Sequence, residues 1–293
     1  MRYRLYGLTV EAPWRLPCPD GDGPVDVRFV RSTQRASPVR ADWFWREVLS
    51  DGSEHLVWTD HAEFRMSSDA STVSYLPLSR ATSATIETFL LGQVLSFVLL
   101  RRGREPFHAT VLERDDRAVA LLGRSGQGKS TLAAAMLTRD WRIMTDDLMV
   151  VDGTDALPGM PRIKLFPRAA NLLGLRGEPI AKGSTKEVIS LPTSMFCAEQ
   201  VPLERIYALR NTQAVRCSIR RLSAKRALLT LTSNTFNTRV TEGGRLRQQF
   251  AESTRLALSV PVRSLSYPRT MKVLTEACAA IERDVDQPLQ SRR

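Results

Sequence analysis

Hydrophobic and polar residues alternate in short runs over the first eighty positions of the chain. Alternation of this kind is typical of β-strands, and Pro, Gly, Asp and Ser separate the runs as they do at turns. The predicted strands cover residues 3–10, 25–31, 55–59, 63–66 and 72–75. We therefore expect residues 1–82 to form a small, mainly antiparallel, β-rich module.

A longer apolar segment follows at residues 84–100, with the run IETFLLGQVLSFVLL. Its length and composition are typical of an amphipathic or buried helix, and it ends at a basic turn over 101–104. Gln93 interrupts the apolar run, which is too short to cross a bilayer. The first residues lack the apolar core of a signal peptide. We expect no membrane segment and a cytoplasmic protein.

Two strand-like runs, 109–113 and 118–122, flank a polar turn near positions 115 and 116. This pattern predicts a β-hairpin. Folding about that turn would place His108 opposite Gly123.

The residues after the hairpin read GRSGQGKST and match the phosphate-loop pattern GxxxxGK[ST]. A buried strand precedes them and an alanine-rich helix follows, which is the order that the motif requires. Glycines let the backbone N–H groups turn toward phosphates, and the lysine and the hydroxyl reach the β/γ-phosphates and Mg²⁺. The predicted nucleotide-binding residues are Gly123, Ser125, Gly126, Gln127, Gly128, Lys129, Ser130 and Thr131.

A strand predicted at 141–145 ends in Asp146 and Asp147, one helix and one strand after Lys129. A hydroxyl kinase needs one carboxylate for Mg²⁺ and another to orient or deprotonate the acceptor. The pair can supply both functions, although two aspartates are also common in a simple turn at a strand end.

The rest of the chain mixes strands and helices. We predict a short strand and a helix within 158–174, a polar loop at 183–186, strands at 205–209 and 215–222, and helices at 224–233, 245–259 and 269–283. Residues 83–283 would then form a phosphate-loop core with a helical C-terminal part, and 284–293 a flexible tail.

Composition narrows the classes of partner. The 293 residues are 43% hydrophobic, enough to bury a core, and the formal net charge is +11. Such a charge suits acidic partners, although an arginine-rich solvated surface explains it equally well. The basic clusters lack interleaved aromatic residues, so nucleic acid is a minor hypothesis. The four scattered cysteines indicate neither a zinc site nor a disulfide framework.

Together, Phe107 and His108, the hairpin, GRSGQGKST and the run TDD at 145–147 resemble the catalytic core of bacterial HPr serine kinase/phosphorylase, a core also similar to that of phosphoenolpyruvate carboxykinases. The resemblance implies an α/β (α+β) fold with a mixed sheet and flanking helices, and it implies ATP and Mg²⁺ as cofactors. It also implies that Asp146 is the base toward the acceptor hydroxyl, that His108 assists it, and that Asp147 and Ser130 hold Mg²⁺.

The opening strand, LLGQVL at 90–95, GMPRIKL at 159–165 and RLSAKRA at 221–227 resemble the HPr-kinase-like proteins of lasso-peptide biosynthesis clusters. Those kinases phosphorylate the C-terminal serine of a precursor peptide, so a peptide or small protein is the implied acceptor. Within 159–165, strand alternation places Arg162 and Lys164 on one face. Either one would stabilise the transferring phosphoryl group, or the face is equally a solvated strand edge. An EIRG-type segment is missing after the core, which argues against HPr itself as acceptor and against a reverse phosphorylase reaction.

Two other functions stay open. One is a kinase that acts on the hydroxyl of a small molecule, and the other is a regulatory module that binds a nucleotide without transferring phosphate. The residues leave the acceptor, the preferred nucleotide and the oligomeric state undecided, with a homo-oligomer among the alternatives.

Overall fold

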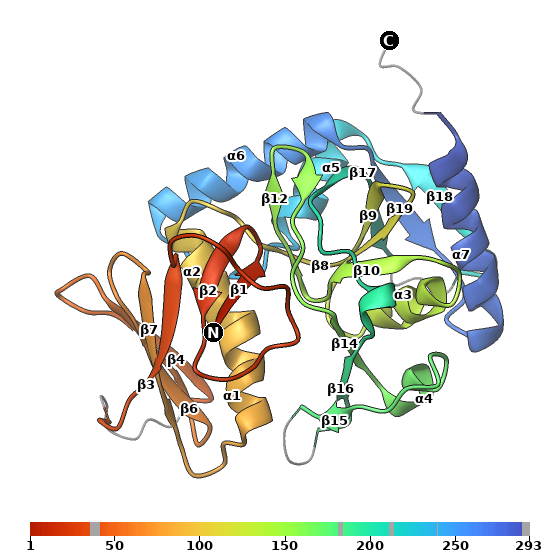
Figure 1. Ribbon diagram of the computed structural model, residues 1–293. Helices are drawn as coiled ribbons and strands as arrows, with labels where there is room; N and C mark the ends of the chain where they lie inside the picture. The colour runs from red at the N-terminus through yellow and green to blue at the C-terminus, as the bar shows by residue number, and fades with distance from the viewer. Residues whose placement is uncertain (36–41, 181–183, 211–213, 239, 289–293) are drawn as a thin grey trace.

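Figure 1 shows the computed structural model of the chain, which describes all residues except 36–41, 181–183, 211–213, 239 and 289–293. The described residues form a seven-stranded sheet, a nine-stranded sheet and a small three-stranded sheet. Helices pack against the two larger sheets. The structure is therefore of the mixed α/β kind expected, with mixed sheets and flanking helices.

The N-terminal sheet combines antiparallel and parallel pairs. Its strands, in spatial order, are β1 (Arg2–Leu5), β2 (Leu8–Glu11), β3 (Val27–Arg31), β7 (Thr72–Pro77), β6 (Ala62–Met66), β5 (Glu54–Trp58) and β4 (Phe44–Val48). The β2–β3 and β3–β7 pairs are parallel and the other four are antiparallel. The single strand expected at 3–10 is a hairpin instead, because Tyr6 and Gly7 both adopt positive φ angles that end β1.

One continuous helix packs on this sheet, in three consecutive parts. They are α1 (Ser83–Phe89), a π-helical turn η1 (Leu90–Val94) and α2 (Leu95–Arg101). By length and composition, the span Ser83–Arg101 would be apolar enough to cross a membrane, but 61% of it is buried inside the structure. Leu90, Val94 and Val98 are fully buried against the sheet, so the span is built as a core helix.

The hairpin predicted before the phosphate loop is present. Strands β8 (Phe107–Arg114) and β9 (Arg117–Leu122) pair antiparallel, with Ala109 opposite Leu122, so His108 lies level with Gly123. Asp115 and Asp116 form the turn with φ angles of 54° and 57°. Left-handed residues at both central positions match the right-handed twist of the strands.

The nine-stranded sheet is built around this hairpin. Beside β9 lie, in parallel, β17 (Val201–Leu209) and then β19 (Val262–Ser266). The other strands are β10 (Arg142–Thr145), β11 (Leu148–Met149), β12 (Val151–Asp152), β13 (Asp155–Ala156) and β18 (Ser218–Arg221).

Helices cover both faces of the nine-stranded sheet (Figure 1). Val119 and Leu121 of β9 face the helices α3 (Lys129–Leu137) and α7 (Met271–Asp286). Ala118, Ala120 and Leu122 face α5 (Ala224–Thr232) and α6 (Gly243–Ser259) on the other side. A strand buried on both faces is apolar at every position, which is why 118–122 has no alternation in the sequence.

The third sheet and two short helical segments lie beside α3. They consist of β14 (Arg162–Leu165), β16 (Glu187–Ser190), β15 (Glu178–Pro179), α4 (Pro167–Ala170) and the 3₁₀ turn η2 (Thr193–Met195). The strand and helix expected within 158–174 are thus β14 and α4. The loop expected at 183–186 precedes β16, and its residue 183 lies outside the described residues.

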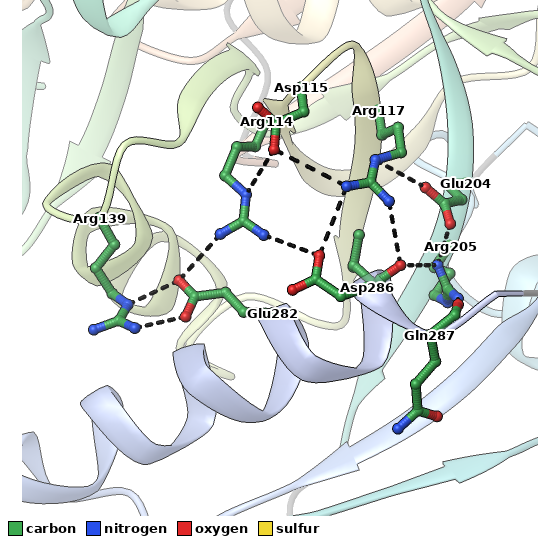
Figure 2. A network of polar contacts seen from close by, with 10 residues as sticks. Arg114, Asp115, Arg117, Arg139, Glu204, Arg205, Glu282, Asp286 and Gln287 are labelled. Carbon is green, nitrogen blue, oxygen red and sulfur yellow. Dashed lines mark hydrogen bonds and ion pairs between the residues drawn. The ribbon is translucent and has the colours of Figure 1, made fainter.

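Figure 2 shows how charged residues attach α7 to the turn of the β8–β9 hairpin and to β17. The helix continues through Asp286, three residues into the expected tail, because Asp284 is buried and paired. Its carboxylate accepts a hydrogen bond from Tyr207 at 2.7 Å and contacts Arg263 at 2.9 Å. Residues 289–293 of the expected tail lie outside the described part.

Candidate active site

The phosphate loop connects β9 to α3 with the backbone that its glycines permit. Gly126 and Gly128 have φ angles of 79° and 86°, a region that L-residues rarely adopt. Gly128 stands at the N-cap of α3, where no side chain covers the first N–H groups of the helix. A helix N-terminus left open in this way is suited to bind phosphate.

Lys129 lies beneath the loop, with only 5% of its surface exposed. Its ammonium group donates hydrogen bonds to the carbonyl oxygens of Gly123 at 2.7 Å and Arg124 at 3.3 Å. Burial lowers the pKa of Lys129 to about 8, an effect that Asp146 and Asp147 partly oppose. The lysine is therefore positioned at the loop before any phosphate arrives.

Asp146 faces the phosphate loop. Its Oδ1 accepts hydrogen bonds from Thr110 at 2.6 Å and from the hydroxyl of Ser130 at 3.2 Å, and its Oδ2 accepts one from the backbone N–H of Lys164 at 2.9 Å. Burial, and then the charge of Asp147, raise the pKa of Asp146 above its usual range. Both oxygens of this carboxylate thus accept hydrogen bonds from residues around the position where a phosphate loop holds its metal ion.

Asp147 faces a different set of groups. The ammonium of Lys164 donates to its Oδ2 at 2.6 Å. Burial alone would raise the pKa of Asp147, but Lys164, with His108 and Lys129, outweighs it and lowers that pKa below its usual range. Asp147 has a φ of 76°, and a left-handed aspartate of this kind is a conformation that active sites often hold.

His108 stands at the start of β8 beside this carboxylate. Burial, and next the charge of Lys129, lower the pKa of His108 to about 4, so its imidazole is neutral at physiological pH. The ring of Phe236 stacks on the imidazole, with 5.6 Å between the ring centres. A neutral histidine held by an aromatic ring can accept a proton or a hydrogen bond in a fixed direction.

The loop residues, with His108 and Asp147, line a cavity of about 80 Å³ in front of the loop, whereas Asp146 is not among its described lining residues. Lys164, Lys186, Leu165 and Phe166 form its far wall. The ammonium of Lys186 lies 5.2 Å from the ring centre of Phe166, within cation–π range. Lys186 belongs to no motif in the sequence, and it reaches the site only because β16 pairs with β14.

Arg162 lies on the same face of β14 as Lys164 but has a different partner. Its guanidinium pairs with Glu87 of α1 at 3.2 Å, and the residue is 6% exposed. Among the described residues that line the cavity, Lys164 is present and Arg162 is not. The expected pair of phosphoryl-stabilising cations is therefore divided: Lys164 lines the cavity, whereas Arg162 pairs with Glu87 of α1.

Two further residues that sequence reasoning missed hold the carboxylates in place. Thr110 shares a strand face with His108, two positions along β8, so strand alternation is the signal that could have found it. Tyr6, in the β1–β2 turn, is fully buried, and its hydroxyl lies 2.9 Å from that of Thr145. The contact between Tyr6 and Thr145 joins residues 139 positions apart, so no local sequence pattern predicts it.

The residues present fit a magnesium site of the kind that phosphates complete. Among the described residues, no group of three or more His, Cys, Asp or Glu side chains is arranged to hold a metal by itself. Mg²⁺ usually keeps several waters and takes one or two carboxylates together with phosphate oxygens. Asp146 and the hydroxyl of Ser130, 3.2 Å apart, offer that partial set.

No protein-family model matches the chain, and no curated protein sequence matches it. Among solved structures, the chain is similar to the HPr(Ser) kinase/phosphatase from Coxiella burnetii, at 13% identity and a TM-score of 0.33. The match covers 61% of this chain and 95% of the other.

Proposed function

We propose that the protein is an ATP- and Mg²⁺-dependent kinase that transfers the γ-phosphoryl group to a serine hydroxyl of a peptide or small protein. One observation carries this proposal: the two adjacent carboxylates at the phosphate loop face different groups. Asp146 faces Ser130, whereas Asp147 faces Lys164 and the neutral His108. A protein that only binds a nucleotide needs the first carboxylate but has no use for the second.

The geometry favours the opposite assignment of the two aspartates from the one that the family resemblance implies. Ser130 donates to Asp146, so these two residues would hold Mg²⁺ together. Asp147 lies with His108 in the cavity and would accept the proton of the acceptor hydroxyl.

Lys164 lies where it can contact both Asp147 and the γ-phosphoryl group of the donor. Its ammonium neutralises Asp147, which makes that carboxylate a weak base while the cavity holds no phosphate. A bound γ-phosphoryl group competes for the ammonium of Lys164. The pKa of Asp147 then rises, because the ammonium contacts the phosphate instead of the carboxylate. The base is thus strengthened when the donor is in position.

The transfer step follows from this placement. The acceptor oxygen forms a bond to the γ-phosphorus, the bond from that phosphorus to the bridging oxygen of ADP breaks, and the acceptor proton moves to Asp147. Lys129 and the first N–H groups of α3 bind the phosphate oxygens. Mg²⁺, when bound, neutralises charge on the β- and γ-phosphates.

The sequence resemblance supports a finer proposal for the acceptor, the C-terminal serine of a lasso-peptide precursor. The test incubates the purified protein with Mg²⁺-ATP and peptides that end in serine. A mass gain of about 80 Da is expected on the peptide. ATP binding without phosphate transfer to any peptide or small-molecule hydroxyl would overturn the kinase proposal, whereas transfer to small molecules alone would overturn its acceptor.

The assignment of the aspartates has its own test. Asp147→Asn should lower phosphate transfer by about 10²- to 10⁴-fold with little change in the Mg²⁺ concentration required. Asp146→Asn should instead raise that concentration. Asp116→Asn is the matched control, because asparagine accepts the left-handed turn position. The reverse pattern, with the Mg²⁺ requirement changed by Asp147→Asn, would restore the assignment from the resemblance.

A further inference from the structure

A second cavity, of about 340 Å³, lies against the phosphate loop. The two cavities share a wall of loop and helix residues, Gly126, Gly128 and Thr131. The remaining lining residues are Arg168, Tyr267, Arg269, Thr270 and Leu274. The proposed phosphotransfer does not use this space.

Tyr267 brings a hydroxyl to this cavity. The residue is 5% exposed, and its hydroxyl lies beside the loop, 3.5 Å from where a Cβ at Gly128 would stand. Within the part of the chain that the structure describes, this hydroxyl has no hydrogen-bond partner. A phenolic hydroxyl can both donate and accept a hydrogen bond, so Tyr267 can bond an oxygen of a ligand in this cavity.

The charges around the cavity favour an anion. Arg168 and Arg269 both line it, and no carboxylate is among its described lining residues. Arg269 is held in place by hydrogen bonds to the carbonyl oxygens of Gly126 at 3.2 Å and Arg210 at 3.4 Å.

The N-terminus of the sixteen-residue helix α7 begins at the cavity wall. Thr270 is its N-cap but forms no side-chain cap bond, and the first turn holds no acidic residue. The first N–H groups of the helix therefore add positive potential there.

The direction of α3 shows which part of a nucleotide reaches this space. Lys129 serves the terminal phosphates, and Ser130 and Thr131 follow it in the first turn of the helix. Their N–H groups meet phosphates that lie progressively closer to the nucleoside. Since Thr131 lines both cavities, a triphosphate whose γ-phosphate lies in the first cavity leads into the second.

We propose that the second cavity binds the nucleoside end of the triphosphate, with Tyr267, Arg168 and Arg269 bonding oxygens of the α-phosphate and ribose. This inference rests on the nucleotide-binding part of the proposed function and not on phosphate transfer.

A rival cavity, also of about 340 Å³, lies at the first arm of the loop. Arg124 and Arg210 line it, but its uncharged polar side chains already have partners: Gln127 accepts from the N–H of Arg124, and Thr230, Ser233 and Asn234 each donate to a carbonyl oxygen. It also lacks Thr131. The rival cavity therefore has fewer uncharged polar groups available to bind a nucleoside than the cavity at Tyr267 has.

The experiment compares the affinities of ATP and inorganic tripolyphosphate by calorimetry in the presence of Mg²⁺. Tripolyphosphate has the phosphates but no nucleoside. Tyr267→Phe removes only the hydroxyl and should weaken ATP binding about tenfold while tripolyphosphate binding is unchanged. Thr270→Trp fills the cavity and should weaken ATP binding further, again without effect on tripolyphosphate.

Two variants serve as controls. Arg176→Ala removes one exposed arginine outside either cavity, and Ser233→Trp fills the rival cavity. Both should bind ATP like the parent protein. Equal losses of ATP and tripolyphosphate in Tyr267→Phe, or loss of ATP binding in Ser233→Trp but not in Thr270→Trp, would overturn the inference. ATP binding with this pattern but without phosphate transfer would overturn only the kinase proposal.

Discussion

The two ends of the β8–β9 hairpin both carry many charged residues, but only at the turn end do the positive and negative charges balance. At the turn end, five arginines meet five carboxylates: Arg114, Arg117, Arg139, Arg205 and Arg263 with Asp115, Glu204, Glu282, Asp284 and Asp286. Figure 2 shows most of this network. Its charges balance within the protein.

At the open end, positive charge is in excess. Lys129, Lys164 and Lys186 line the first cavity, and Asp147 is the single carboxylate among its described lining residues. Tyr267, Arg168 and Arg269 line the second cavity, which has no carboxylate among its described lining residues. Charges that are satisfied internally hold the fold together, whereas unsatisfied ones indicate where an anionic ligand belongs. Substitutions at the two ends should therefore affect different measurements.

The largest effect is expected from Lys129→Met at the open end. Loss of the buried ammonium at the transferring phosphates should lower phosphate transfer by about 10²- to 10³-fold, because electrostatic stabilisation of this kind is a major part of catalysis. A transfer assay with labelled ATP measures the rate. Lys225→Met, at an exposed position on α5, removes the same charge and should leave the rate unchanged. A parent-like rate in Lys129→Met would show that the loop binds no donor.

At the turn end, Asp284→Asn should cost stability instead. It removes the buried charge that Arg205, Arg263 and Tyr207 share, and we expect a loss of about 3 kcal/mol in the free energy of unfolding. Urea denaturation measures it. Asp286→Asn is the control: the Asp286 side chain is 58% exposed, so the loss should stay within about 1 kcal/mol. ATP affinity should not change in either variant. A large change would show that the turn end of the hairpin contributes to ligand binding as the open end does.

Lys186→Ala tests whether the third lysine belongs to the site. Loss of one charge-assisted contact to a phosphate should lower kcat/KM by about 10- to 100-fold. Lys272→Ala, on the exposed side of α7, is the matched control. If both variants retained the parent's kcat/KM, Lys186 would be a bystander at the cavity wall.

The smallest effect concerns pH. Burial lowers the pKa of Lys129 to about 8, so its charge is largely present at pH 7 and largely lost at pH 9. Anionic phosphates bind the charged form, so ATP affinity should fall about tenfold over that interval. Calorimetry at pH 8 in buffers of different ionisation enthalpy should show that ATP binding takes up a fraction of a proton. Lys129→Met should abolish the uptake, and an unchanged uptake would place the titration elsewhere.

The same pKa shift has the opposite sign for the stability of the ligand-free protein. The pKa of Lys129 is lower in the folded chain than in the unfolded chain, so the unfolded state binds more protons above pH 8. Lys129 therefore raises the free energy of unfolding as the pH rises from 8 toward the pKa that this lysine has in the unfolded chain.

Local patterns in the sequence determined the elements next to the phosphate loop. The hairpin register, its turn at Asp115 and Asp116, and the strand that ends at Asp146 follow from residues close together in the chain, and the structure contains all three. The strand β19 escaped notice because its alternation VRSLS is short and lies between two helices, and it is stabilised by a parallel partner 56 positions away.

Only the tertiary structure decided which partner each charged side chain has. Arg162 and Lys164 are equivalent in the sequence, yet Arg162 pairs with Glu87 of α1, whereas Lys164 pairs with Asp147, which follows β10. Asp146 and Asp147 are adjacent, but a left-handed φ at Asp147 turns them toward different groups. Strand and loop propensities act over a few residues, whereas the electrostatic environment of a side chain depends on segments that are brought together by folding.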